Sequence, residues 1–300
     1  MTADAASGHP GMDGARAPAT AAPGSEAPLG APVTSPGLGD ELAGALRDAA
    51  RAYVLGLGDD ALILSHRLTE WVTRAPALEE ELALANVALD LLGQARGLLE
   101  RAGQLGGPAS TADDLAYLRD ARGFRNCLLV ELENGDFART MARQLLFSAW
   151  QLPLYERLRH SNDSALAGVA AAGAREAAYH LDHAALWVRR LGDGTDESHR
   201  RMQEGLDAVW PYAAELFLPE PFEGGLVLGA LVQRELAVDP AALEPVWSAT
   251  VHQVVTEATL EVPTGDWRPA GGRQGLHTEA FGFLLAELQS LRRTEPEASW

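Results

Sequence analysis

The sequence predicts an all-α protein in the form of a helical bundle, and three observations lead to this fold class. From about residue 40 the chain is rich in Ala, Leu, Glu and Arg, which favour helices, and poor in β-branched runs. Apolar residues recur at three- and four-residue spacing over segments several turns long, as in helices that bury one face. Capping residues and glycines bound these segments. We therefore expect one helical domain over residues 40–300.

Residues 1–39 are almost entirely Ala, Pro, Gly, Ser and Thr, and they show no apolar periodicity. A segment of this composition cannot bury enough surface to offset the entropy lost when the chain becomes ordered. We expect a disordered Ala/Pro/Gly-rich tail without a function of its own.

Charge and cysteine content exclude several classes of function. The net charge of −18 argues against a nucleic-acid partner, because phosphate backbones require a basic surface. The chain has no lysine, which excludes Schiff-base chemistry, and its one cysteine, Cys127, excludes an internal disulfide and a cysteine-based metal cluster. No apolar run approaches the roughly 20 residues of a membrane span, and no signal pattern opens the chain. We expect a cytoplasmic protein that contacts no membrane.

Start and stop signals divide the domain into helices. Asp40 caps the first helix, the sequence at 57–60 separates it from the second, and Pro153 predicts a kink within a later one. A tight turn near residue 160 makes the two helices around it antiparallel neighbours. The expected helices, in chain order, span 41–55, 60–74, 78–106, 113–119, 136–160, 161–194, 197–217, 240–261 and 277–293.

The helix at 78–106 carries an unusual polar stripe. Asn86, Asp90 and Gln94 follow one another at four-residue spacing along an otherwise apolar helix. The stripe is either a solvated edge or a polar seam inside the bundle, and the helix alone does not decide between them. Small residues on the same helix would allow a neighbouring helix to approach closely: Ala85, Ala88 and Gly93.

The helix at 161–194 carries Glu176, His180 and His183 on successive turns of roughly one side. Carboxylates and imidazoles that project inward from long helices build the metal site of carboxylate-bridged di-iron bundles. Such a site also needs Glu-x-x-His pairs from two helices. Only His199 has an acid three residues before it, Asp196, and that pair lies at a predicted helix start.

The other helices do not complete the metal site. The helix at 78–106 has no histidine, and the helix at 136–160 offers Arg143 in place of a mid-helix carboxylate. We therefore expect no catalytic residue and no metal bound by this chain. A vestigial ion network should fill the bundle centre instead, formed by Glu70, Asp90, Arg143, Glu176 and His180. The alternative is an autonomous di-iron oxygenase or oxidase with an atypical site at Glu70, Asp90, Glu176 and His180.

Two other chemistries find little support in the sequence. There is no Gly-x-Ser-x-Gly motif and no phosphate-binding glycine loop. Asp182-His183 and His277-Thr278-Glu279 are candidate acid–base pairs, but no third residue completes a catalytic set, so we favour structural roles for them.

Five stretches of the chain resemble one protein family. The sequence is similar to the C subunits of bacterial ring-1,2-phenylacetyl-CoA epoxidases over residues 45–300. These stretches carry the resemblance: LGDDALILSHRLTEW, LALANVALDLLGQAR, ELENGDFARTMARQLLFSAW, REAAYHLDHAALWVRRLGDGTD and GRQGLHTEAFG.

The resemblance implies a ferritin-like four-helix bundle core with additional C-terminal helices and without iron of its own. It implies a stable complex with the catalytic di-iron A subunit, as well as contact with the small B subunit. That complex inserts one oxygen atom into the ring of phenylacetyl-CoA, with electrons from NADPH delivered by a reductase subunit. On this basis we expect a non-catalytic structural subunit.

The resemblance also implies two strips near coenzyme A. Arg122 and Arg125 suit the first strip on chemical grounds, because guanidinium groups match phosphate oxygens. The expected substrate-binding residues are Gly123, Phe124, Arg125 and Asn126 in the first strip, and Gly229, Ala230 and Leu231 in the second.

Overall fold

A computed structural model of the chain describes residues 38–107, 110–219 and 225–296. The tail expected at 1–39 lies outside these residues, apart from its last two, which begin the first helix. The described residues contain helices and no strands, so the all-α prediction is confirmed for them.

The helices follow the expected order, and several bounds differ from those expected. The α-helices are α1 Leu38–Thr69, α2 Leu78–Gly106, α3 Ala112–Tyr117, α4 Leu128–Glu131, α5 Phe137–Leu158, α6 Ser164–Gly192, α7 Asp196–Val209, α8 Gly225–Gln233, α9 Glu244–Glu257 and α10 Glu279–Thr294. Four 3₁₀ helices lie between them in the described residues: η1 Ala121–Gly123, η2 Trp210–Phe217, η3 Pro240–Leu243 and η4 Gly272–Gln274.

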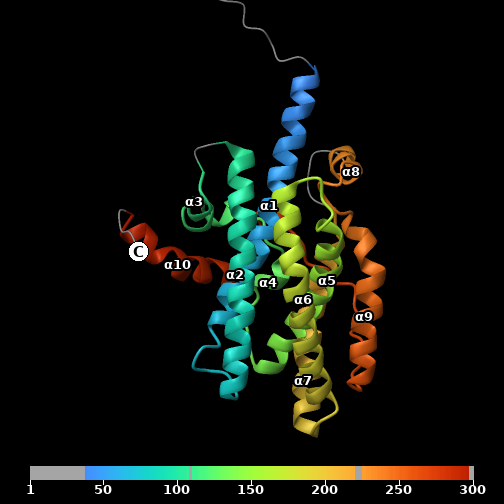
Figure 1. Cartoon of the computed structure of the whole chain (residues 1–300). Helices are drawn as coiled ribbons and strands as arrows, with labels where there is room; N and C mark the ends of the chain where they lie inside the picture. Colours follow the sequence, from blue (N-terminus) through green and yellow to red (C-terminus); the bar gives the residue numbers. More distant parts are fainter. Residues whose placement is uncertain (1–37, 108–109, 220–224, 297–300) are drawn as a thin grey trace, which may run out of the picture. The chain divides into compact units, whose positions relative to one another are not determined.

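Four long helices form the core of the bundle. α1 packs along α2, α5 packs along α6, and α2 meets α6, so that two helix pairs lie side by side (Figure 1). α7 and α9 pack against α5 and α6, while α3 packs on α2 and α10 on α3. The sequence therefore correctly predicts α5 and α6 as neighbours and the additional C-terminal helices.

The beginning of the domain differs most from the prediction. A cap at Asp40 and a break at 57–60 were expected, yet α1 begins at Leu38 and continues without interruption to Thr69. Gly58 lies against α2, where an added Cβ would meet the Leu99 side chain at 3.0 Å. Asp59 is fully buried and paired with Arg119 from outside α1. Tertiary contacts thus hold residues in a helix that their local propensity would end there.

The boundaries of the later helices agree better with the prediction where local capping residues determine them. The Asp136 carboxylate accepts from the Arg139 amide and starts α5, and Asp163 caps α6 in the same way. Pro153 lies inside α5, as predicted. The helix expected at 197–217 changes to 3₁₀ geometry at Trp210, and the one expected at 240–261 begins as η3.

α2 is a long and largely apolar helix. Among the described residues it alone has the length and composition of a membrane-spanning helix, which corrects the expectation that no segment does. Core helices of soluble proteins share these properties. In α2, 44% of the most apolar 18-residue stretch is buried. α2 therefore carries apolar residues beyond those that its contacts with α1 and α6 cover.

Candidate functional site

The centre of the bundle is polar where α2, α5 and α6 meet. The Gln94 amide donates to the Glu176 carboxylate at 2.8 Å, and its oxygen accepts from Gln151 at 3.0 Å and from the Tyr155 hydroxyl at 3.2 Å. One turn further along α6, the His180 ring contacts Asp90 at 3.0 Å. Burial lowers the pKa of His180 below its ordinary value, although the hydrogen bond and charge of Asp90 act in the opposite direction.

The polar stripe on α2 is a solvated edge at one end and a polar seam inside the bundle at the other. Gln94 is buried and belongs to the seam, Asp90 is half-buried, and Asn86 is exposed. The stripe thus rotates from the solvent into the core along the helix.

Arg143 lies on α5 and is fully buried. It donates to the Leu132 carbonyl at 2.6 Å and to the Asn134 side chain at 2.5 Å. Asn134 donates in turn to Glu70 at 3.0 Å, and Glu70 also pairs with Arg67. Burial, followed by the charge of Arg67, lowers the pKa of Arg143 to about 9.

The expected single ion network is therefore wrong in its connections. Arg143 reaches Glu70 only through Asn134, while Asp90 pairs with His180 and Glu176 pairs with Gln94. No three His, Cys, Asp or Glu side chains converge to hold a metal ion among the described residues. The acids also bind separate partners, and the core nearby contains the buried guanidinium of Arg143. These residues do not fit a di-iron centre, which needs several carboxylates around one point.

The first strip expected near coenzyme A lies between η1 and α4. Its residues contribute unequally, because the side chains of Phe124 and Asn126 are fully buried. Arg125 is partly exposed, and its guanidinium donates to the carbonyls of Arg122 and Phe124 at 2.7 and 2.9 Å. Arg122 is exposed. Only Gly123 and the two arginines of this region can reach a ligand.

The second strip lies in α8, on a different element. Gly229 and Ala230 are partly exposed, whereas Leu231 is buried and cannot line a ligand surface. An added Cβ at Gly229 would meet open space.

The candidate acid–base pairs are both bound to carboxylates from other helices. His183 contacts Glu80 of α2 at 2.9 Å, and His277 contacts the buried Glu131 at 2.7 Å. Sequence reasoning missed the acidic partners, and it missed Asp59, Asp60, Glu215 and Arg273, whose charges are buried around the first strip. Their only sequence signal is a charge inside an otherwise apolar segment.

The outer side of α2 carries a row of exposed leucines, which we call the leucine row: Leu78, Leu82, Leu89 and Leu92, exposed at 67, 58, 64 and 43%. Their spacing places them on one side of the helix, opposite the buried residues that face α1 and α6. A surface helix normally presents polar residues there. An exposed apolar row of this kind is typical of a protein–protein contact.

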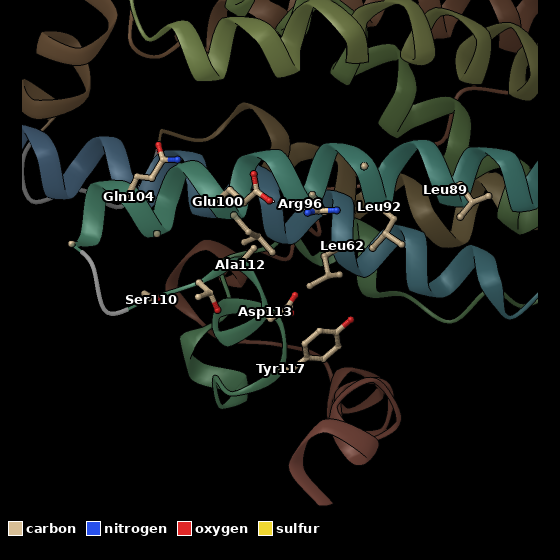
Figure 2. Close-up of a pocket in the computed structure, with 17 residues that line it drawn as sticks. Leu62, Leu89, Leu92, Arg96, Glu100, Gln104, Ser110, Ala112, Asp113 and Tyr117 are labelled. Carbon is tan, nitrogen blue, oxygen red and sulfur yellow. Dashed lines mark hydrogen bonds and ion pairs between the residues drawn. The ribbon is translucent and has the colours of Figure 1, made fainter. Parts of the chain in front are cut away.

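The leucine row runs into a groove between α2 and α3. The groove has a volume of about 910 Å³, and Leu62, Leu99 and Tyr117 contribute to its walls. Figure 2 shows Leu89 and Leu92 along α2 and Tyr117 and Asp113 on the opposite wall, with Arg96 and Glu100 further along α2. Gly93, expected to allow a close helix contact, instead lines this open groove.

Comparison with known proteins agrees with the resemblance seen in the sequence. Residues 39–300 match the model of a family described as phenylacetic acid catabolic protein. The C subunit of 1,2-phenylacetyl-CoA epoxidase from Escherichia coli (strain K12) is 47% identical over 249 residues, which cover 83% of this chain and 98% of that relative.

Proposed function

Because this chain belongs to the phenylacetic acid catabolic protein family, we propose that it is the structural, non-catalytic C subunit of a 1,2-phenylacetyl-CoA epoxidase. It works in phenylacetate catabolism as part of a cytoplasmic complex of several chains. Its partners are the catalytic di-iron A subunit, which performs the chemistry, together with the small B subunit. Neither a nucleic acid nor a membrane takes part.

The leucine row and the adjoining groove are the observation that carries this proposal. α2 presents leucines on two opposite sides, one covered by the bundle and the other exposed. Covering the outer row removes apolar surface from water, which is the main favourable contribution in stable protein–protein interfaces. A second helical bundle, such as a homologous A subunit, offers a complementary surface for a straight row on one helix.

The division of labour in the complex follows from the bundle centre. Gln94 binds Glu176 and Asp90 contacts His180, and no set of metal-binding side chains forms among the described residues, which supports a subunit that supplies a folded body. In the complex, the A subunit holds the di-iron site, and a reductase delivers electrons from NADPH. This chain contributes Arg122 and Arg125 to the phosphates of the CoA thioester, for which guanidinium groups are well suited.

Reconstitution tests the proposal. We expect the A subunit to epoxidise phenylacetyl-CoA only when this chain is present. Leu82→Glu combined with Leu89→Glu should weaken, by at least about tenfold, the affinity for the A subunit, because charges would be buried at the interface. Leu291→Glu is the matched control, since Leu291 is similarly exposed on α10, away from the leucine row.

Two results would contradict the proposal. Full turnover by the other components without this chain would show that the complex does not need it as a structural subunit. Turnover by this chain alone, with reductase and NADPH, would favour the alternative of an autonomous oxygenase.

A further inference from the structure

The backbone of residues 123–128 is held by charged side chains, most of them buried and from distant parts of the chain. This segment links η1 to α4 and has no helix or strand of its own at 124–127. Side chains therefore supply the hydrogen bonds that regular structure would supply. Arg119 donates to the Gly123 carbonyl at 2.8 Å, Asp59 accepts from the Arg125 amide at 2.8 Å, Arg273 donates to the Arg125 carbonyl at 2.7 Å, Asp60 accepts from the Cys127 amide at 2.7 Å, and Glu215 accepts from the Leu128 amide at 2.7 Å.

Glu131 and His277 also hold this segment, and we call this pair the anchor. The Glu131 carboxylate is fully buried and accepts from the Asn126 amide at 2.8 Å, from His277 Nδ1 at 2.7 Å and from the Thr278 backbone amide at 2.6 Å. His277 Nε2 faces the Phe124 carbonyl at 3.3 Å. Both ring nitrogens of His277 therefore face oxygen atoms, that of Glu131 and that of Phe124.

The Phe124 carbonyl connects this anchor to the expected ligand surface. It lies 3.3 Å from His277 Nε2 and accepts from the Arg125 guanidinium at 2.9 Å. The position of the Arg125 guanidinium therefore depends on the position of a carbonyl that His277 holds.

Burying charged side chains around a connecting segment costs free energy. Each buried charge loses its hydration, and only well-placed partners offset that loss. A short connection could be stabilised with neutral caps and turns at lower cost. Groups that fix a backbone to this degree are typical of surfaces where a bound ligand requires a rigid geometry.

We propose that His277 and Glu131 are positioning residues that fix the Phe124 carbonyl, and through it the Arg125 guanidinium, for the phosphates of the CoA thioester. This inference rests on the proposed function, because that function supplies the ligand. The His277 side chain is buried and stacked on Phe281, so we assign it a positioning role and no contact with the substrate.

The single cysteine allows a test of the anchor that does not depend on activity. Cys127 lies in the segment, is fully buried, and is the only cysteine of the chain. In folded wild-type protein, labelling with a thiol reagent reports how often this segment opens. We expect His277→Phe, which retains the stacking, to speed labelling by at least about tenfold, and His277→Gln, which retains one donor, to have a smaller effect.

His199→Phe is the control for loss of a histidine, because the His199 ring also contacts a carbonyl, that of Gly192, but on α6. It should leave the labelling rate of Cys127 unchanged once differences in global stability are subtracted. Equal labelling in wild type and His277→Phe would overturn the anchor.

The second readout is kinetic and uses the reconstituted complex. With His277→Phe, KM for phenylacetyl-CoA should rise by about tenfold while kcat changes by less than about twofold, and His277→Gln should restore part of the loss. Faster labelling with an unchanged KM would overturn the positioning role. If Arg122→Ala and Arg125→Ala leave KM unchanged in otherwise wild-type complex, the proposed CoA contact fails, whereas the labelling experiment still decides whether the anchor exists.

Discussion

Arg143 and its partners illustrate how single residues settle the chemistry of the bundle centre. The guanidinium is buried, and no carboxylate lies within ion-pair distance of it in the described part of the chain. Its two hydrogen bonds go to a carbonyl and to Asn134. Gln94 and Glu176 likewise bind each other, as do Asp90 and His180, so substitutions of these residues should act through pairs.

The Arg143–Asn134 contact can be measured by a double-mutant cycle. Arg143→Met leaves the Asn134 oxygen without this donor, and Asn134→Leu leaves Nη2 of the guanidinium without its acceptor. Because the double variant removes both groups together, its loss of unfolding free energy should be smaller than the sum of the single losses, by about 1–3 kcal/mol. Chemical denaturation provides the four values, and additive losses would show that the contact contributes nothing.

His180 should make stability depend on pH. Burial lowers its pKa in the folded state below the ordinary value of 6.5, so the unfolded state takes up a proton that the folded state does not. The free energy of unfolding should therefore fall as pH decreases through 6.5 toward the folded-state pKa.

His180→Gln keeps a hydrogen-bond donor for Asp90 but cannot titrate. Urea denaturation between about pH 7.5 and about pH 5 should show a smaller loss of stability for this variant than for wild type. Some loss should remain, because burial also lowers the pKa of His66. A loss as large as in wild type would contradict the assignment to His180.

At the scale of helices, close approach depends on which glycine faces a neighbour. An added Cβ at Gly97 of α2 would lie 2.6 Å from the Val169 side chain of α6, whereas one at Gly93 would meet nothing within 4 Å. The two glycines lie one turn apart, and only Gly97 lets the helix pair of α1 and α2 approach the pair of α5 and α6.

The two glycines should therefore respond in opposite directions to alanine. Gly97→Ala should lower the free energy of unfolding by about 1–3 kcal/mol through overpacking, and Val169→Ala in the same chain should restore part of it. Gly93→Ala should raise stability by about 0.5–1 kcal/mol, because alanine favours the helix and has room. Thermal or chemical denaturation compares them, and equal effects at both positions would contradict the packing of α2 on α6.

At the scale of the whole molecule, a helical bundle is combined with a centre whose described residues do not fit a di-iron site. The acids that could serve as ligands are divided between His180, Gln94 and the pair of Arg67 with Asn134. Part of the apolar surface that stays exposed in the described residues is the leucine row on α2. Both features are what the proposed role of a subunit that works by association requires.

Metal analysis tests this at the level of the chain. The protein expressed alone with added iron should fold and bind no stoichiometric iron, because its carboxylates do not converge. The complex co-expressed with the A subunit serves as the positive control. About two irons per chain of the isolated protein would support the alternative di-iron enzyme.

The sequence by itself determined the features that depend on neighbouring residues. The all-α class and the helices expected at 136–160 and 161–194 depend on interactions within a few residues, such as the caps that Asp136 and Asp163 form in the structure. The lack of Glu-x-x-His pairs was also readable directly, as were the stretches that resemble a known family, and the family match agrees with them.

Only the tertiary structure decided the features that join distant residues. The break expected at 57–60 disappears because Asp59 and Asp60 find Arg119 and Arg273 as buried partners, the latter 213 positions away. Arg143 prefers Asn134 to the acids on α2 and α6, and Phe124 and Asn126 of the expected substrate strip turn into the core. A local pattern states that a residue is charged or apolar, but the partner of a buried charge depends on which helices pack around it, and that is fixed only when the whole chain folds.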